Sequence, residues 1–292
     1  MATAGQWIEG ARPRTLGAAI APVATGSGVA AAAGALQPGR ALLALLVMVA
    51  AQIGVNYAND YSDGIRGTDD QRVGPVRLVG QGLASPGAVR AAAVVCLGIS
   101  ALAGLLLVAL TAQWWLLAVG AVSLAAGWLY TGGPQPYGYH GLGEVSVFIF
   151  FGVVPVVGTA YVQTLTFSTT AWVSSIGVGA LTCAILVANN LRDIPTDAAT
   201  GKRTLAVRLG DGPTRVLYVA LVVSAFVVIV PLAVGLGLTL ALLALLAAPL
   251  AIAPVAAVSR GATGHALVAV LKGTGLVVLA YGLLLGLGVG LS

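Results

Sequence analysis

Long stretches without a charged side chain constrain this 292-residue chain more than any single motif does. A helix needs about 20 apolar residues to cross a hydrocarbon core about 30 Å thick. Two shorter charge-free runs each hold one such helix, three longer runs each hold a helical hairpin with a polar break, and the residues after 265 hold one more. The sequence therefore predicts nine transmembrane helices. The five charge-free runs are residues 15–39, 41–59, 91–143, 145–191 and 216–259.

The composition agrees with a chain whose surroundings are membrane lipid. Hydrophobic residues make up 59% of the chain, charged residues only 8%, and there are 40 glycines. Small residues allow helices to approach closely in lipid, where packing drives association. We therefore expect an all-α polytopic membrane protein, with residues 1–292 forming one transmembrane domain.

The positions of the charges predict the orientation. With nine spans and the N-terminus inside, every Lys and Arg except Arg40 falls in or beside a cytoplasmic loop, and so do all nine Asp and Glu. The positive-inside rule explains the cations but says little about acids. Any polar chemistry is therefore expected on the cytoplasmic side of the cell membrane. No basic block resembles a nucleic-acid-binding arm, so nucleic acid is not an expected partner.

An internal repeat places acids at two corresponding positions. "ANDYSD" at 58–63 recurs as "ANNLRD" at 188–193, so that Asn59 and Asp63 match Asn189 and Asp193. Both copies end an apolar run and are followed by basic loops. In the nine-helix count these are helices two and six. The chain is therefore predicted to contain two four-helix pseudo-repeats and one further helix.

The spacing within each copy indicates what the acids could hold. Asn59 and Asp63 are four residues apart, as are Asn189 and Asp193, and Asp197 follows four residues later. Residues four apart share one face of a helix. Oxygen-only ligands suit Mg²⁺, which keeps several waters and is often completed by substrate phosphates. Two such faces, with the basic loops nearby, predict a site that binds a diphosphate through Mg²⁺.

A simpler interpretation is that these acids are solvated helix caps that balance positive loops. We favour it for acids that lie deeper in polar loops, namely Asp69, Asp70 and Asp211. Acids near lipid are costly and usually functional. For the acids at the ends of the apolar runs we therefore favour a role in binding the metal and the diphosphate. The catalytic candidates are Asp63, Asp193 and Asp197. Asp60 lies between the two interpretations.

Longer phrases resemble a known family of intramembrane aromatic prenyltransferases, the UbiA superfamily. Its members carry Asn-Asp-x-x-Asp after helix two and Asp-x-x-x-Asp after helix six, which match "NDYSD" at 59–63 and "DIPTD" at 193–197. The phrases "RVGPVRLVGQG", "LYTGGPQPYGY" and "NNLRDIPTDAATGKRTLAVRLG" are similar to the branch that prenylates 1,4-dihydroxy-2-naphthoate in menaquinone biosynthesis. A further Asp of the family pattern is replaced here by Gly67, with Asp69 and Asp70 just beyond.

The resemblance implies a nine-helix fold with a cavity open to membrane lipid. It implies Mg²⁺ as cofactor, a polyprenyl diphosphate donor, and an allylic cation that the naphthoate ring attacks with loss of CO₂ to give demethylmenaquinone. The implied metal ligands are Asn59, Asp60, Asp63, Asp193 and Asp197. The implied diphosphate-binding residues are Arg72, Arg77, Lys202 and Arg203.

Candidates for binding the aromatic acceptor come from one loop and from the N-terminal segment. The loop carries Tyr130, Tyr137, Tyr139 and His140. Phenols and an imidazole can bind or deprotonate a hydroxyaromatic ring, but aromatic residues also anchor loops at a bilayer surface. Arg14 in "ARPRT" could pair with the acceptor carboxylate or only fix the topology.

Three other functions compete with this one. Another member of the superfamily would use a benzoquinone precursor, haem or a sugar-phosphate lipid as acceptor. A CDP-alcohol phosphotransferase would need Asp-Gly-x-x-Ala-Arg, and "DGIRG" lacks the Ala-Arg. A cation-coupled transporter could also carry repeats and paired acids, but its acids are expected near the midplane of the membrane.

Overall fold

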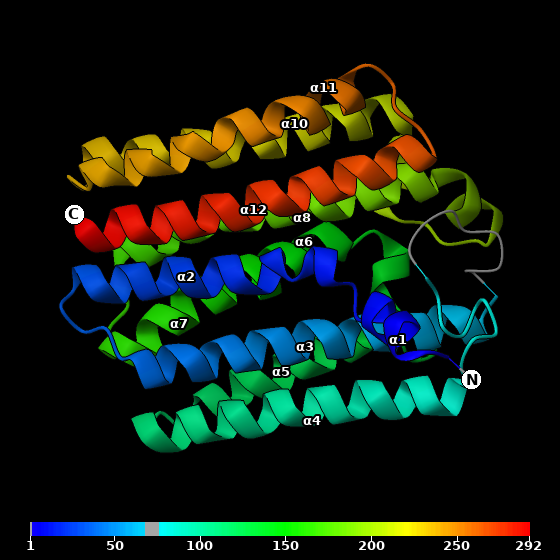
Figure 1. Ribbon diagram of the computed structural model, residues 1–292, viewed down its shortest axis with the longest axis horizontal. Helices are drawn as coiled ribbons and strands as arrows, with labels where there is room; N and C mark the ends of the chain where they lie inside the picture. Colours follow the sequence, from blue (N-terminus) through cyan, green and yellow to red (C-terminus); the bar gives the residue numbers. More distant parts are fainter. Residues whose placement is uncertain (1, 68–75) are drawn as a thin grey trace.

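The protein is an all-helical bundle in the computed structural model, which describes residues 2–67 and 76–292. The prediction of an all-α fold is confirmed: every regular element in these two ranges is helical. Most helices run along the long axis of the bundle (Figure 1). In the first half they are α1 (Ala4–Gly10), η1 (Pro13–Thr15), α2 (Gly17–Ala32), α3 (Pro38–Ile65), α4 (Pro86–Thr111) and α5 (Leu116–Leu129).

The second half contains several helices whose regular pitch is interrupted. Phe148–Val153 (η3) and Pro231–Gly235 (η4) are π-helical turns, and Thr239–Ala247 (η5) is a 3₁₀ segment. The remaining elements are η2 (Tyr137–His140), α6 (Gly143–Val147), α7 (Val154–Thr164), α8 (Thr169–Ala199), α9 (Leu205–Leu209), α10 (Asp211–Val227), α11 (Ala248–Ser259) and α12 (His265–Leu291).

The number of spans differs from the prediction of nine. Within the described ranges, seven helices are long and apolar enough to cross a membrane, and an eighth span results if α1–η1 and α2, which meet at a 47° bend, count as one. α5 accounts for the difference because it has only 14 residues. At 1.5 Å per residue it is about 21 Å long, less than the thickness of a bilayer core. A left-handed residue at Ala112 ends α4 and the turn that follows shortens α5.

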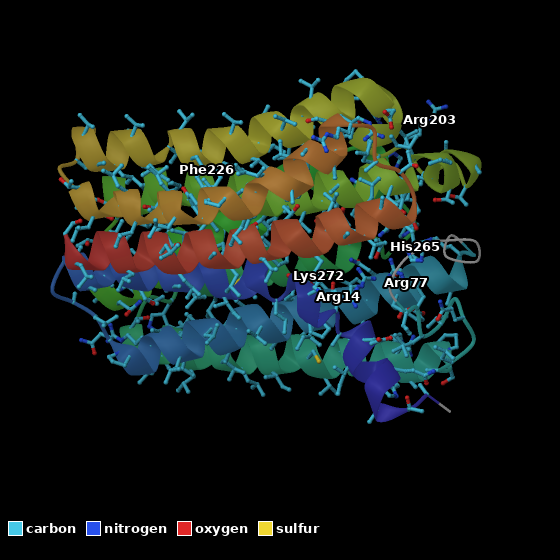
Figure 2. All side chains as sticks on the ribbon, turned by 45° about the horizontal axis from the view of Figure 1, so that its top comes forward. Arg14, Arg77, Arg203, Phe226, His265 and Lys272 are labelled. Carbon is cyan, nitrogen blue, oxygen red and sulfur yellow. The ribbon has the colours of Figure 1, made fainter. Side chains whose placement is uncertain are left out.

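The motif-bearing helices α3 and α8 are the two longest, and both end at the same end of the bundle. α3 packs along α4, and α8 packs along α10, so each is paired with the helix that follows it in the span order. Polar and charged side chains gather where α3 and α8 end, as the positions of Arg77, Arg203 and His265 show (Figure 2). The fold therefore brings the two copies of the sequence repeat to one end.

Arg40, the exception in the charge distribution, lies at the other end of α3. Its guanidinium donates to the carbonyl oxygen of Val162 at 2.9 Å and to that of Leu110 at 3.3 Å. These carbonyls belong to the last turns of α7 and α4, where the helix dipole favours a cation. Arg40 thus joins three helix ends.

Close packing of α2 against α12 depends on glycine. The two helices lie side by side (Figure 1), and a Cβ atom at Gly28 would overlap the carbonyl oxygen of Gly286. We expect Gly28→Ala to lower the free energy of unfolding by about 1–3 kcal/mol, the usual cost of overpacking. Thermal unfolding in detergent measures this loss. Gly98→Ala on α4 is the matched control, because nothing lies within 4 Å of its Cβ position, and an unchanged melting temperature for Gly28→Ala would contradict the packing argument.

Candidate functional site

The first acid cluster occupies the last turns of α3. Asn59 and Asp63 line a large cavity, and the Asp63 side chain is almost fully buried. Asp60 faces elsewhere: its carboxylate accepts the backbone N–H groups of Leu78 at 2.8 Å and Val79 at 3.1 Å. Asp60 therefore anchors the segment that leads into α4, whereas Asn59 and Asp63 face the cavity.

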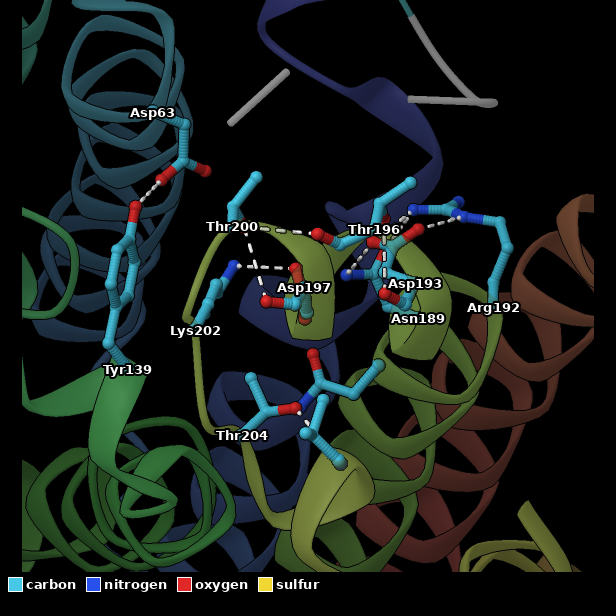
Figure 3. A network of polar contacts seen from close by, with 12 residues as sticks. Asp63, Tyr139, Asn189, Arg192, Asp193, Thr196, Asp197, Thr200, Lys202 and Thr204 are labelled. Carbon is cyan, nitrogen blue, oxygen red and sulfur yellow. Dashed lines mark hydrogen bonds and ion pairs between the residues drawn. The ribbon is translucent and has the colours of Figure 1, made fainter. Parts of the chain in front are cut away.

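The second cluster occupies the last turns of α8. Asp193 is held by Arg192, whose Nε lies 2.7 Å from Oδ1 and whose Nη2 lies 2.8 Å from Oδ2. The same Nη2 donates to Asn189 Oδ1 at 2.9 Å. One turn later, Lys202 Nζ lies 3.6 Å from Asp197 Oδ1. Each acid of this cluster therefore has a cation beside it (Figure 3).

Tyr139 connects the two clusters. Its hydroxyl donates to Asp63 Oδ1 at 2.7 Å, its ring lies 5.0 Å from Lys202 Nζ, and its carbonyl accepts the backbone N–H of Arg203 at 2.9 Å. Asn59 is also held by this loop, because Thr131 Oγ1 donates to Asn59 Oδ1 at 2.7 Å. The loop between α5 and α6 thus spans the gap between the repeats (Figure 3).

The cavity has a volume of about 1060 Å³ and changes character along its length. Near the acid clusters it is bordered by polar and basic side chains, while most of its remaining wall is apolar. The basic residues at its wall are Arg12, Arg14, Arg77, Arg192, Lys202 and Lys272. Representative apolar residues are Met48, Leu105, Leu124, Phe150, Phe151 and Ile185. Such a cavity can hold an anionic headgroup at one end and a hydrocarbon chain beyond it.

The predicted diphosphate-binding residues are not all at this wall. Arg77 is buried and lines the cavity, and so does Lys202. Arg203 is exposed and lies at the rim of the molecule (Figure 2), and it is not part of the cavity wall. Arg72, together with Asp69 and Asp70, lies outside the described residues.

The predicted acceptor-binding residues divide in the same way. Arg14, Tyr130 and Tyr137 line the cavity. The Tyr137 hydroxyl donates to the Ala126 carbonyl at 2.7 Å, and burial raises the pKa of this phenol, so Tyr137 is a neutral hydrogen-bonding group and not a base. Tyr139 is not part of the cavity wall, and its hydroxyl donates to Asp63. His140 is exposed and also lies outside the wall.

The sequence did not point to several residues of the cavity wall. The available signal for Arg192 is its position directly before Asp193, whereas the predicted diphosphate-binding residues all follow one of the two motifs. Lys272 is predicted only as a cation in or beside a cytoplasmic loop, but it lies within α12, about 10 Å along this helix from His265, and it reaches the same cavity as Arg14 (Figure 2). No local pattern identifies Arg12, whose left-handed backbone, at φ 55°, begins the turn η1.

The donor atoms fit a magnesium ion better than a metal held by protein alone. Among residues 2–67 and 76–292, no three His, Cys, Asp or Glu side chains lie close enough to hold one ion. The cavity wall offers carboxylate and amide oxygens from Asp63, Asn59 and Asn189. Mg²⁺ commonly uses only one or two carboxylates, with waters and substrate phosphates completing its shell.

An all-helical, membrane-type bundle with acids and cations beside an apolar cavity belongs to the class of membrane proteins that can enclose an amphipathic anion. Residues 19–267 match the model of the UbiA prenyltransferase family. The chain belongs to this family, and the resemblance predicted from the motifs is confirmed.

Two curated relatives match 97% and 76% of the chain. The 1,4-dihydroxy-2-naphthoate octaprenyltransferase of Mycobacterium tuberculosis is 55% identical over 283 residues, which is 97% of this chain and 96% of that protein. The protein of the same name from Escherichia coli is 37% identical over 227 residues, or 76% of this chain and 74% of that protein.

Solved structures share the fold at low sequence identity. A UbiA homolog from Aeropyrum pernix K1 in its apo form gives a TM-score of 0.69 at 17% identity, covering 93% of this chain and 96% of that one. A UbiA homolog from Archaeoglobus fulgidus bound to GPP and Mg²⁺ gives 0.65 at 13% identity, covering 95% and 98%.

Proposed function

We propose that this protein transfers a polyprenyl chain from polyprenyl diphosphate to 1,4-dihydroxy-2-naphthoate, with loss of CO₂, as a step of menaquinone biosynthesis. The observation that carries the proposal is the cavity itself, which joins an acidic and basic mouth built by both repeats to a long apolar interior. The names of the relatives from Mycobacterium tuberculosis and Escherichia coli support the choice of acceptor.

The donor would lie along the cavity with its diphosphate at the polar mouth. Arg77 and Lys202 would donate to phosphate oxygens, and the apolar wall would take the prenyl chain. Asn59, Asp63 and Asp197 would hold Mg²⁺. Asp60 and Asp193, which the motifs also assign to the metal, already accept hydrogen bonds from the backbone of Leu78 and Val79 and from Arg192. Mg²⁺, when bound, supplies charge that neutralises the departing diphosphate.

The acceptor would lie beside the reacting end of the prenyl chain. Arg12, Arg14 and Lys272 line one wall of the cavity and could pair with the naphthoate carboxylate. The hydroxyls of Tyr130 and Tyr137 could hydrogen-bond the acceptor hydroxyls. The C–O bond to diphosphate would break, the ring carbon would bond to the allylic carbon, and the carboxylate would leave as CO₂.

The membrane arrangement is part of the same proposal. We propose nine spans, with α5 as a short one, and with the N-terminus and the acid clusters on the cytoplasmic side. The support is the distribution of Lys and Arg, which avoids the opposite loops except at Arg40. Accessibility labelling of a single cysteine placed at Arg203 or at Gly34, in a variant without Cys96 and Cys183, would test the orientation.

The reaction is tested with purified protein in detergent. We expect product that is prenylated and decarboxylated when polyprenyl diphosphate, 1,4-dihydroxy-2-naphthoate and Mg²⁺ are all present, and we expect chelation to abolish turnover until Mg²⁺ is restored. Mass spectrometry of the extracted lipid measures the product. Turnover with hydroxybenzoate but not with the naphthoate would refute only the acceptor, whereas turnover that survives chelation would refute the metal.

A further inference from the structure

Arg192 donates hydrogen bonds to the carboxylate oxygens of Asp193, which the motif assigns to a metal. Its guanidinium takes both carboxylate oxygens of Asp193 and the amide oxygen of Asn189 through Nε and Nη2 (Figure 3). The interaction is enclosed, since the side chains of Arg192 and Asp193 are only 2% and 4% exposed. The guanidinium, and not an open carboxylate, is therefore what α8 presents beside the cavity.

The third guanidinium nitrogen is not used in this way. Arg192 Nη1 is buried, and among the described residues it has no hydrogen-bond partner. Arg192 lines the cavity, whereas Asp193 is not part of its wall. Leaving a buried donor unsatisfied costs about 1–3 kcal/mol, and more for a charged group. A bound ligand that supplies a hydrogen-bond acceptor to Arg192 Nη1 explains why this costly buried donor lies beside the cavity.

The local geometry also argues against simple charge neutralisation. Neighbouring residues on a helix do not face each other, so the Arg192 side chain must curl back to reach Asp193. A buried ion pair is weak evidence for stability, because desolvation can exceed the Coulombic gain. What a fixed arginine does provide is a planar fork that matches phosphate oxygens.

We propose that Arg192 binds the diphosphate of the donor, with Nη1 donating to a phosphate oxygen while Asp193 and Asn189 hold the guanidinium in place. In this assignment Arg192 contacts the substrate, and Asp193 is a positioning residue that acts through Arg192 and not as a metal ligand. The metal is left to Asn59, Asp63 and Asp197. This inference rests on the proposed function, because it concerns the diphosphate-binding end of the same cavity.

Binding of inorganic pyrophosphate with Mg²⁺ to the full-length protein in detergent tests the inference without turnover. Isothermal titration at several Mg²⁺ concentrations gives both the pyrophosphate affinity and the Mg²⁺ concentration needed for half-maximal binding. We expect Arg192→Lys, which keeps the charge but loses the fork, to weaken pyrophosphate binding about 10- to 100-fold with an unchanged Mg²⁺ requirement.

Asp193→Asn separates the positioning role from metal binding. If Asp193 acts through Arg192, this variant weakens pyrophosphate binding in the same direction with an unchanged Mg²⁺ requirement, and the Arg192→Lys/Asp193→Asn double variant is no weaker than the weaker single variant. Arg215→Lys is the matched control, because Arg215 also pairs with an aspartate, Asp211, through two hydrogen bonds but does not line the cavity. It should bind pyrophosphate as the unmodified protein does.

Two results would overturn the inference. One is pyrophosphate binding by Arg192→Lys at the affinity of the unmodified protein. The other is a tenfold or larger rise in the Mg²⁺ requirement of Asp193→Asn, which would make Asp193 a metal ligand. If Arg192→Lys does not fold, the neutral double variant Arg192→Gln/Asp193→Asn replaces it, and unchanged binding there overturns the inference equally.

The proposed function is judged separately by turnover. Failure of the unmodified protein to prenylate the naphthoate, with its pyrophosphate binding intact, would refute the proposed reaction and leave the role of Arg192 standing. Normal turnover together with unweakened pyrophosphate binding by Arg192→Lys would refute the role of Arg192 alone.

Discussion

Asp63→Asn is expected to lower turnover by about a hundred- to a thousand-fold, the usual cost of losing one charge-stabilising group in an active site. Asp63 is buried and lines the cavity, and it is the aspartate of the first cluster that does so. The fold should survive, because Asn has the same shape and its amide oxygen can still accept the Tyr139 hydroxyl. Initial rates at saturating donor and Mg²⁺, with thermal unfolding of the same preparation, measure both properties.

Tyr139→Phe is the control for that experiment. It removes the hydrogen bond to Asp63 but keeps the ring beside Lys202. We expect a much smaller loss of turnover than in Asp63→Asn, because the carboxylate remains. Equal losses in the two variants would mean that the connection to the loop matters and not the charge of Asp63. Retention of more than a tenth of the turnover by Asp63→Asn would contradict its role at the site.

Asp60→Ala is expected to act on stability, although Asp60 is only three residues from Asp63. Its removal leaves the N–H groups of Leu78 and Val79 without their acceptor in a buried region. At about 1–3 kcal/mol for each buried donor, the loss is about 2–6 kcal/mol. For a chain of this size we expect the melting temperature to fall by roughly 5–15 °C, as measured by thermal unfolding in detergent.

Asp60→Asn is expected to cause a smaller loss of stability than Asp60→Ala, because its one amide oxygen can still accept a single N–H. It should melt between the unmodified protein and Asp60→Ala. A different outcome would support the ligand role that the family motif assigns to Asp60: unchanged melting temperatures together with a raised Mg²⁺ requirement for turnover. The two aspartates of "NDYSD" are thus expected to differ: substitution of Asp63 lowers turnover and leaves the melting temperature nearly unchanged, whereas substitution of Asp60 lowers the melting temperature.

The sequence predicted that the acid motifs lie at the last turns of two long helices because the signals are local. The charge-free runs stop at residues 59 and 191, whereas α3 continues to Ile65 and α8 to Ala199. The four-residue spacing of Asn59 and Asp63 places both side chains on one face. That face does reach the cavity. The repeat likewise predicted that the second cluster would share the same end of the bundle as the first.

The contacts that complete the site were beyond the sequence because they join distant segments. Tyr139 reaches Asp63 across 76 positions, and Thr131 reaches Asn59 across 72. Spacing along one helix says nothing about such pairs. The break between α4 and α5 lies where the polar interruption of the run predicts it, but α5 is short because the backbone turns at residues 112–115 and the helix begins only at Leu116.

The loop that joins the two repeats has a consequence for how the protein is made. The Tyr139 hydroxyl meets Asp63 early in the chain, but the carbonyl of the same residue meets Arg203, and its ring lies beside Lys202, more than sixty positions later. A ribosome must therefore deliver α8 and the segment after it before this end of the cavity is complete. Until then the proposed donor and Mg²⁺ have no complete site through which to stabilise the nascent chain by mass action. The five predicted spans that precede α8 must therefore be stabilised during insertion by lipid and by helix packing alone.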